Sequence, residues 1–234
     1  MSSVHVASGP DRRNAGHPYP KLPWGVVAAP ALLAVILGTA SYGTNTLTID
    51  HDVSQWVQAR NASWADPLST FGNAIGEAPV AIALLCASLL VGALLRWWQT
   101  IWFVLVVALA RLCSVYLKGL FESPRPNVDQ VRLTETFENL GFPSGHVLTS
   151  TLVAGTLVYI IGLRFSDHRA RIVLAGLWLV AIGCTAFARI WVGAHWLTDT
   201  VGGALFGIFI ILLAANLSTL LVNWWPGRPS SAGP

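Results

Sequence analysis

The chain is poor in charge and in cysteine, and both shortages limit what it can be. Only 11% of its 234 residues are charged, against about 25% in a soluble domain. Most of its surface therefore cannot face water, and the mean hydropathy of +0.59 indicates a membrane protein. The three cysteines are odd in number and show no Cys-x-x-Cys spacing, so they indicate neither a disulfide framework nor a zinc site.

Neither a cleavable signal peptide nor an internal repeat is expected. Residues 1–23 are polar and basic, and the apolar run that starts at Trp24 is too long for the apolar part of a signal peptide. The composition therefore predicts a cytoplasmic tail over residues 1–23, a membrane domain over residues 24–225 and a second cytoplasmic tail over residues 226–234.

Six apolar stretches are long enough to cross a bilayer, which takes roughly 20 residues in a helix. They are residues 24–42, 78–95, 100–120, 146–163, 171–190 and 198–222. We predict an all-α, polytopic membrane protein with six transmembrane helices. The polar stretch 50–71 has Val53, Trp56, Val57 and Trp64 at roughly helical spacing. It is predicted to be an amphipathic segment on the outer surface, with an ordinary packed loop helix as an equal alternative.

The basic residues determine the expected orientation. An even number of spans places both termini on one side, which then receives eight basic residues and two acids. These basic residues are Arg12, Arg13, Lys21, Arg96, Arg164, Arg169, Arg171 and Arg228. Because cytoplasmic loops are rich in Lys and Arg, both termini are predicted to be cytoplasmic.

With this topology, polar residues from three hairpin regions meet at the outer ends of the predicted spans. They are Lys118, Arg125, Ser144, Gly145, His146, Arg189, His195 and Asp199. Each alone has a simpler interpretation: a cation can snorkel to the interface, a serine can cap a helix, and a His–Asp pair can be structural. Their convergence weakens these interpretations, because charged groups within membrane spans are costly and usually functional.

Three cations in one place are suited to holding a phosphate. Arg125 and Arg189 offer several planar donors, and Lys118 offers a compact charge. A helix that opens at Ser144–Gly145 adds backbone N–H groups and the positive end of its dipole. The sequence therefore predicts a phosphate site on the outer face.

Two histidines fit the chemistry of phosphoryl transfer at such a site. Asp199, four residues after His195, can fix the tautomer of that ring and leave the other nitrogen free to attack. His146, on another helix start, then acts as the general acid. The rival is a metal site with His146, His195 and Asp199 as ligands. The neighbouring cations would repel a dication, so no metal and no cofactor are expected.

The residues also resemble a known family, the type 2 phosphatidic acid phosphatase superfamily of membrane lipid phosphatases. Its three sequence blocks match "KGLFESPRP" (118–126), "PSGH" (143–146) and "ARIWVGAHWLTD" (188–199). One position departs from the pattern, because Ala188 stands where the family usually has Ser, so one hydrogen bond to phosphate is expected to be missing. The family includes soluble vanadium-dependent haloperoxidases, and six apolar spans argue against that branch.

The resemblance implies a role for each residue of the cluster. Phosphate would be bound by Lys118, Arg125, Ser144, Gly145 and Arg189. His195 would be the phosphohistidine nucleophile, assisted by Asp199, with His146 as the acid. These roles agree with those that the chemistry of the residues indicates.

The sequence thus predicts a metal-independent phosphatase that acts on a lipid phosphate in the membrane and has no nucleic-acid partner. In a bacterial inner membrane, the resemblance implies undecaprenyl diphosphate as the favoured substrate, with phosphatidic acid and phosphatidylglycerophosphate as further candidates. The alternative is a non-catalytic lipid-phosphate binder or transporter, which would need polar groups near the bilayer midplane. Arg111 is the one clear candidate for such a group, and Glu77 or backbone carbonyls are its expected partners.

Overall fold

Every regular element in the described part of the chain is a helix. The computed structural model describes residues 21–43, 46–59, 62–134, 140–164 and 167–224. Its helices are α1 (Trp24–Ala40), α2 (Thr48–Gln58), α3 (Ala65–Ile75), α4 (Ala78–Leu94), α5 (Trp98–Cys113), η2 (a 3₁₀ turn, Ser114–Leu117), α6 (Lys118–Phe121), α7 (Gly145–Gly162), α8 (His168–Trp191) and α9 (Leu197–Trp224). The all-α prediction is confirmed over these residues. The predicted tails, apart from residues 21–23, lie outside them.

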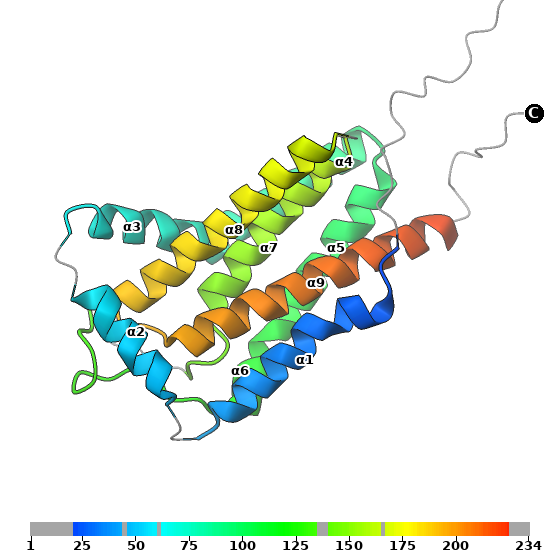
Figure 1. Cartoon of the computed structure of the whole chain (residues 1–234). Helices are drawn as coiled ribbons and strands as arrows, with labels where there is room; N and C mark the ends of the chain where they lie inside the picture. The colour runs from blue at the N-terminus through cyan, green and yellow to red at the C-terminus, as the bar shows by residue number, and fades with distance from the viewer. Residues whose placement is uncertain (1–20, 44–45, 60–61, 135–139, 165–166, 225–234) are drawn as a thin grey trace, which may run out of the picture.

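Six long helices run between two ends of the molecule, and each corresponds to one apolar stretch of the sequence (Figure 1). Helix α9 packs against α1, α5 and α7, and α7 also packs against α8. Aromatic rings fill the core between them: Phe103 stacks on Tyr159 with centroids 3.8 Å apart, and Phe142 meets Phe121 edge to face. Large apolar side chains such as Leu94 and Leu109 are exposed on the outside, as expected where the solvent is lipid.

The number of membrane spans is only partly settled. Four helical segments are long and apolar enough to cross a bilayer: Trp98–Phe121, α7, α8 and α9. The pair α3 and α4, bent by 48° at its break, qualifies as a fifth if taken as one span. Helix α1 has 17 residues, which reach about 25 Å, short of the roughly 30 Å of hydrocarbon core. The six-span count therefore stays a prediction, while the apolar helices make this a membrane protein.

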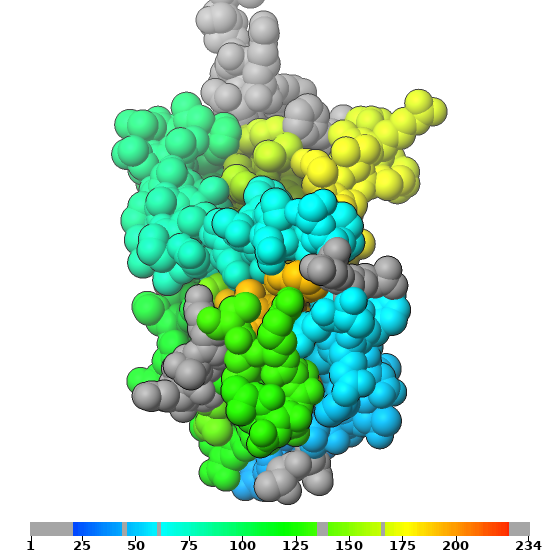
Figure 2. All heavy atoms as spheres, turned by 90° about the vertical axis from the view of Figure 1, so that its left-hand side faces the viewer, coloured from blue at the N-terminus to red at the C-terminus, as the bar shows by residue number. Residues whose placement is uncertain are grey.

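Shorter elements cover one end of the bundle, called the capped end from here on. Helices α2 and α3 and residues 122–134 lie there (Figure 1). Helix α3 packs against α8 and α7, and α2 packs against α8 and α9. Seen from that side, the segment where α8 passes into α9 shows between these three covering elements (Figure 2). The cap therefore surrounds the α8–α9 junction.

The predicted amphipathic stretch 50–71 forms two helices, α2 and α3, both packed on the bundle. Their inward faces carry small or polar residues such as Ser54, Ser69 and Gly72, because the backbones approach closely. The large aromatic side chains Trp56 and Trp64 are exposed instead. The two alternatives of the sequence analysis are therefore combined, since the segment is packed inward and presents aromatic residues outward.

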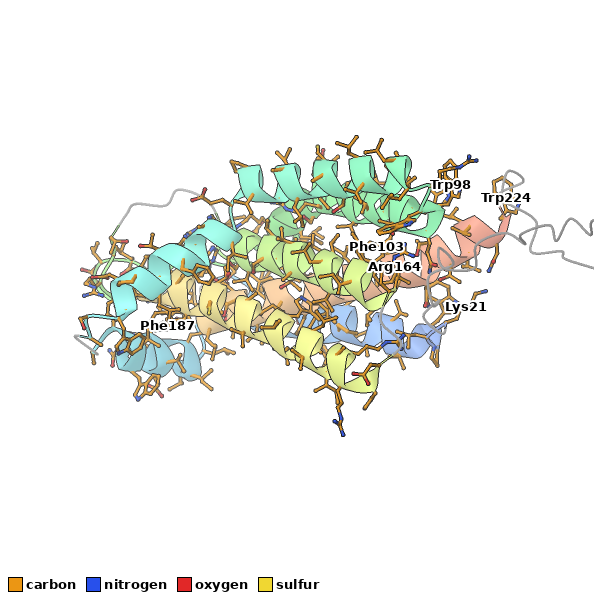
Figure 3. The ribbon with its side chains drawn as sticks, turned by 90° about the horizontal axis from the view of Figure 1, so that it is seen from above. Lys21, Trp98, Phe103, Arg164, Phe187 and Trp224 are labelled. Carbon is orange, nitrogen blue, oxygen red and sulfur yellow. The ribbon has the colours of Figure 1, made fainter. Side chains whose placement is uncertain are left out.

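The opposite end, called the terminal end, holds the first and last described residues. Lys21, Trp98, Arg164 and Trp224 lie there, while Phe187 lies at the capped end (Figure 3). The Arg164 guanidinium stacks over the Trp97 ring at 3.5 Å. This gathering of tryptophan and basic residues is typical of a membrane–water interface.

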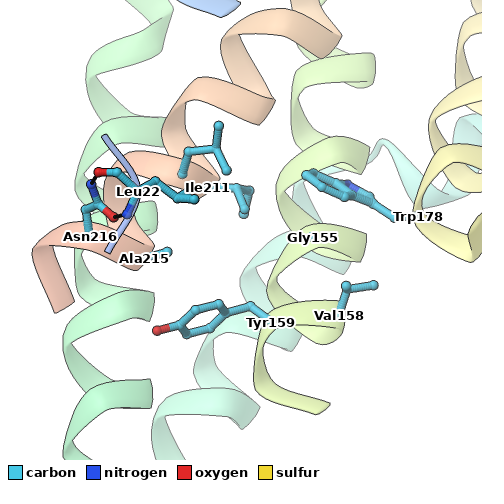
Figure 4. Close-up of a pocket in the computed structure, with 9 residues that line it drawn as sticks. Leu22, Gly155, Val158, Tyr159, Trp178, Ile211, Ala215 and Asn216 are labelled. Carbon is cyan, nitrogen blue, oxygen red and sulfur yellow. Dashed lines mark hydrogen bonds between the residues drawn. The ribbon is translucent and has the colours of Figure 1, made fainter. Parts of the chain in front are cut away.

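A pair of hydrogen bonds fastens the beginning of the described chain to α9. The Asn216 side chain accepts from the Leu22 backbone N–H at 3.0 Å and donates to the Leu22 carbonyl at 2.9 Å (Figure 4). An apolar cavity of about 200 Å³ lies beside this contact, with Gly155, Trp178 and Ile211 in its wall. These contacts hold α1 and α9 together far from the capped end.

Candidate active site

The candidate site lies at the capped end, where α7 and α9 begin side by side. The Ser144 backbone N–H donates to the Asp199 carbonyl at 2.9 Å and joins the two helix starts. A Cβ at Gly203 would lie 2.5 Å from the Ser144 carbonyl oxygen, and a Cβ at Gly141 would lie 2.7 Å from Asp199 Oδ2. A side chain at position 203 would push the two helix starts apart, and one at position 141 would displace the Asp199 carboxylate.

His195 is buried between a carboxylate and a guanidinium. Its Nδ1 lies 3.1 Å from Asp199 Oδ2, and its Nε2 lies 3.2 Å from Arg125 Nη1. A guanidinium has only donors, so Nε2 must accept and the ring proton must be on Nδ1, from which it is donated to Asp199. The Trp196 backbone N–H also donates to Asp199 Oδ2 at 3.1 Å and fixes the carboxylate. The lone pair of Nε2 therefore points toward the cations.

Burial and neighbouring charges keep this ring neutral. The pKa of His195 is lowered well below its usual 6.5, first by burial and then by the positive charges of Arg125, Lys118 and Arg189. Each of these effects disfavours the protonated ring. A neutral imidazole with one available lone pair is the form in which histidine acts as a nucleophile.

Arg125 reaches the site from the segment that follows α6. Its Nη1 also donates to the Ala194 carbonyl at 2.7 Å. The segment itself is attached by the Trp196 indole, which donates to the Pro124 carbonyl at 3.2 Å. Burial lowers the pKa of Arg125, and the charge of Asp199 opposes that shift. The guanidinium is therefore held within hydrogen-bonding distance of the nucleophilic nitrogen.

The other two predicted cations come from different helices and are held by neutral oxygens. Lys118, at the start of α6, donates to the Leu140 carbonyl at 2.6 Å. Arg189, near the end of α8, is buried and donates to Asn73 Oδ1 of α3 at 3.0 Å. Together with Arg125 they act electrostatically on His195. The structure thus brings the three cations to one place around that ring.

The Ser144 hydroxyl is buried and, within the described residues, has no hydrogen-bond partner. Ser144 stands at the N-cap position of α7, but its side chain makes no capping hydrogen bond. The simple capping interpretation of this serine is therefore wrong. A buried hydroxyl without a partner costs free energy, and here it lies beside the open N-terminus of an 18-residue helix that continues with Gly145.

His146 sits in the first turn of α7, against the bend between α3 and α4. A Cβ at Gly76 would lie 2.8 Å from its carbonyl oxygen. The half-buried ring has no hydrogen bond to any residue that the structure describes, and the charges of Arg189, Arg125, Arg111 and Lys118 all act on it. The second histidine therefore shares the cation environment of the first.

The metal alternative finds no support in the geometry. No three His, Cys, Asp or Glu side chains of the described part of the chain are grouped closely enough to hold a metal ion. His195 Nδ1 and Asp199 Oδ2 face each other at 3.1 Å. The three side chains do not form a ligand set.

Three further residues hold the site together, and the sequence analysis did not find their contacts. Asp50 of α2 is buried and accepts from both the backbone N–H and the hydroxyl of Thr198, each at 2.8 Å. Asn73 holds Arg189, as described above. Arg111 donates to the hydroxyls of Thr149 at 3.1 Å and Ser114 at 3.4 Å, rather than to Glu77. In the sequence, Asp50 is one polar residue of the amphipathic stretch 50–71, and Asn73 follows that stretch without any motif that marks it.

The chain was compared with protein families and with known proteins, and it matches both. The family model of the PAP2 superfamily matches residues 99–222, more than half of the chain. A relative from Bacillus subtilis (strain 168), phosphatidylglycerophosphatase B, is 25% identical over 78% of this chain and 89% of its own length.

Two solved structures share the fold. The PAP2-type phosphatidylglycerolphosphate phosphatase from Bacillus subtilis has a TM-score of 0.70 at 18% identity, and the match covers 87% of this chain and all of that one. LpxE from Aquifex aeolicus has a TM-score of 0.56 at 20% identity, with 72% and 95% covered. At these identities the likeness shows the fold alone.

Proposed function

Because the chain belongs to the PAP2 superfamily and is a phosphoric ester hydrolase, we propose that it hydrolyses a lipid phosphate through a phosphohistidine intermediate. The observation that carries this proposal is the environment of His195. Its Nδ1 is held by Asp199, and its Nε2 lies 3.2 Å from the Arg125 guanidinium. Family membership favours this enzyme over the non-catalytic binder or transporter.

The bound phosphate would take the space in front of His195 Nε2. Arg125 shifts its donors from that nitrogen to a phosphate oxygen, and Lys118 and Arg189 bind further oxygens. The Ser144 hydroxyl, which has no partner among the described residues, donates to the same group. The backbone N–H of Gly145 at the start of α7 adds the positive end of the helix dipole.

The reaction then proceeds in two steps of in-line displacement. The negative charge of the bound phosphate offsets the neighbouring cations and so favours a protonated His146 ring. The lone pair of His195 Nε2 attacks phosphorus, the bond to the lipid oxygen breaks, and the protonated His146 gives that oxygen its proton. Asp199 stabilises the positive charge that develops on the His195 ring. In the second step His146 takes a proton from water, the water oxygen attacks phosphorus, and the phosphohistidine bond breaks. Inorganic phosphate leaves, and both histidines return to their starting forms.

No metal ion is needed in this scheme. Lys118, Arg125 and Arg189 carry three positive charges to the place where negative charge develops on the phosphoryl oxygens. Donors that are already in place before the reaction are the largest source of stabilisation in many enzymes. The three cations thus supply the charge neutralisation that metal ions supply in other phosphatases.

The proposed site faces the outside of a bacterial inner membrane, with both termini cytoplasmic. In the described part of the chain, the basic residues of the terminal end are Lys21, Arg96 and Arg164 before or between helices and Arg169 and Arg171 in the first turn of α8, against one acid, Asp167. The acids of α2, α3 and the segment after α6 lie at the capped end. This asymmetry follows the positive-inside rule.

The proposed substrate is a lipid whose phosphate is presented at the outer leaflet. Undecaprenyl diphosphate is the leading candidate, because its chain can stay in the bilayer while its terminal phosphate meets the cations. The name of the Bacillus relative favours phosphatidylglycerophosphate as the second candidate, and phosphatidic acid is the third. Soluble sugar phosphates lack chain burial, worth about 0.8 kcal/mol per CH₂, and should be poor substrates.

Phosphate release from purified lipids tests this proposal. The chain in detergent should release phosphate from at least one of the three lipids, in excess EDTA and without added metal, and orthovanadate should inhibit it. Acid-quenched protein given ³²P-labelled lipid should carry label on His195, and the His195→Ala variant should not. Activity that disappears in EDTA and returns with zinc or magnesium would overturn the metal-independent mechanism.

Labelling of intact cells tests the side of action. Cys86, Cys113 and Cys184 are first changed to Ala, and single cysteines are then placed at Asn127 and at Asp167. A maleimide that cannot cross membranes should label the cysteine at position 127 and leave the one at position 167 unlabelled until the cells are opened. The reverse pattern would place the site on the cytoplasmic face.

A further inference from the structure

Arg111 is a charged residue in the interior of α5 that the proposed chemistry does not use. Its guanidinium donates from Nε to Thr149 Oγ1 and from Nη1 to Ser114 Oγ, at 3.1 and 3.4 Å. Within the described residues no carboxylate forms an ion pair with it. A guanidinium has five donors, so two neutral hydroxyls leave most of its capacity unused. A charge in this position is costly, and such residues usually serve a function.

Thr149 connects Arg111 to the catalytic end. It is buried on α7, three residues after His146, which places it about 4.5 Å further along the helix axis. The charge of Arg111 acts on the His146 ring, as do those of the three phosphate-binding cations. Arg111 therefore lies one helical turn deeper in the bundle than the proposed general acid and on the same side of α7.

A cavity of about 300 Å³ between α4 and α5 begins at this point. Ala78, Leu85, Leu89 and Ala108 are part of its wall, and Arg111 is the one charged residue that lines it. Its α4 wall starts at Ala78, two residues after Gly76, which touches the His146 backbone. The cavity thus lies next to the segment that packs on His146, and it has an apolar wall and one cation.

We infer that Arg111 binds a second phosphate group, located between the phosphate to be cleaved and the lipid chain, and that the chain lies in the α4–α5 cavity. This inference rests on the proposed function. A lipid held with its terminal phosphate at His195 and its oxygen beside His146 extends one turn deeper before the chain begins. Arg111 is the cation at that depth. It makes the site selective for lipids with two phosphate groups over lipids with one.

Two classes of lipid have this chemistry. In a polyprenyl diphosphate the second phosphate is joined directly to the first, and in phosphatidylglycerophosphate it is the diester that follows the glycerol. Undecaprenyl monophosphate and phosphatidic acid are the matched lipids with one phosphate. Selectivity is therefore measured as the ratio of kcat/KM within each pair, which cancels the contribution of the chain.

The experiment compares the purified wild-type chain with Arg111→Gln on both pairs of lipids. A hydrogen bond between charged groups is worth enough to change kcat/KM about 10- to 100-fold, so the ratio should fall by that factor in at least one pair. Arg111→Lys, which keeps the charge, should retain part of the selectivity. The matched control is Arg164→Gln at the terminal end, which should leave both ratios unchanged.

The outcomes separate the inference from the proposed function. A fall of the kcat/KM ratio that is confined to one pair supports the inference and identifies the lipid class. The pair is either undecaprenyl diphosphate with its monophosphate or phosphatidylglycerophosphate with phosphatidic acid. An equal fall on all four lipids means that Arg111 only supports the fold, and unchanged ratios mean that it does not touch the second phosphate; either result overturns the inference. A wild-type chain that cleaves none of the four lipids overturns the proposed function instead.

A second variant keeps the test valid if Arg111→Gln does not fold. Thr149→Val removes the hydroxyl that accepts from Arg111 Nε and keeps the volume of the side chain. The guanidinium loses its fixed position, so the two-phosphate ratio should fall, by less than in Arg111→Gln. Thr149→Ser, which restores the hydroxyl, should bring the ratio back. A ratio that follows neither change would contradict a role of this contact in selectivity.

Discussion

The two ends of the bundle both contain buried polar groups, but the groups are arranged differently. Toward the terminal end, three of them satisfy one another: Gln99 donates to the Tyr159 hydroxyl at 3.0 Å, and that hydroxyl bonds Ser218 at 3.1 Å. At the capped end, Ser144 Oγ and Asp199 Oδ1 are buried without a partner among the described residues. The Tyr159 network is thus closed, although Thr100 Oγ1 and Arg164 Nε near the same end are buried without a partner among the described residues. The groups without a partner at the capped end differ from these because they lie among the candidate site residues.

This difference separates stability from function along one set of helices. A closed network lowers the free energy of the folded state, because each buried donor and acceptor has a partner. An open network costs stability, and three cations around one ring add repulsion. In the proposed function a bound phosphate offsets these costs, because it offers an acceptor to the Ser144 hydroxyl and negative charge to the cations. Substitutions at the two ends should therefore affect different measurements.

The largest effect on activity is expected for His195→Ala. The imidazole is the proposed nucleophile, and no other described histidine has its Nδ1 held by a carboxylate. Loss of a nucleophile that acts together with its partners lowers kcat by about 10⁴-fold or more. Phosphate release from lipid measures this loss, and thermal unfolding in detergent should show that the variant is folded. Wild-type turnover in a folded His195→Ala protein would show that another group attacks phosphorus.

His146→Ala should come next. Removal of a general acid slows catalysis by roughly 10²–10⁴-fold, and the loss should depend on the leaving group. An aryl phosphate with an acidic phenol needs little protonation, so its hydrolysis should fall much less than that of a lipid alkyl phosphate. Equal losses on both substrates would assign His146 to phosphate binding rather than to proton transfer.

Asp50→Ala should have an intermediate effect, through the position of Asp199. Asp50 holds the N–H and hydroxyl of Thr198, the residue before Asp199, so its loss frees the first turn of α9. We expect kcat to fall about 10- to 100-fold, the range for charged hydrogen bonds, with KM little changed. Asp50→Asn keeps an oxygen for the N–H and a donor for the hydroxyl, and should recover most of kcat. Failure of Asn to rescue would argue against positioning.

The pH dependence of wild-type activity should be weak on the acid side. Neutral His195 is the reactive form, and burial and three cations lower its pKa well below 6.5. The acid limb of kcat/KM, which reports the free enzyme, should therefore lie below pH 6.5. It should be measured with an aryl phosphate, so that the protonation of His146 does not limit the rate. An acid limb above pH 6.5 would contradict a neutral ring held among cations.

The helices and the gathering of the candidate residues at one end could be predicted from the sequence, because both depend on local signals. Each apolar stretch became a helix that begins or ends within a few residues of the predicted limits. Because Lys118, Arg125, His146 and His195 lie at the ends of these stretches, they were predicted to meet at one end of the bundle, and the structure has them at the capped end. Apolar length and alternating direction were sufficient for this result.

The contacts that hold the site could not be predicted, because their partners are far apart in the chain. Asp50 and Thr198 are separated by 148 positions, Asn73 and Arg189 by 116, and Arg111 and Thr149 by 38. No periodicity links such pairs, and a polar residue in an amphipathic helix is as often solvated as paired. The packing of α2 and α3 across the capped end decides these contacts, and that packing depends on small residues such as Gly72.

The smallest effect on activity is expected for a substitution at the terminal end, Tyr159→Phe, which should lower the stability of the protein instead. Tyr159→Phe removes a hydroxyl that bonds Gln99 and Ser218 and leaves both without this partner. The loss should cost about 1–2 kcal/mol, which lowers the unfolding temperature by roughly 2–8 °C for a chain of this size, while kcat/KM stays within about twofold of wild type. Ser144→Ala is the matched variant at the capped end. It removes a buried hydroxyl that has no partner among the described residues, so the unfolding temperature should stay unchanged or rise. KM should increase, because phosphate loses one hydrogen-bond donor. If Tyr159→Phe slowed turnover and Ser144→Ala lowered the unfolding temperature instead, the division of roles between the two ends would be wrong.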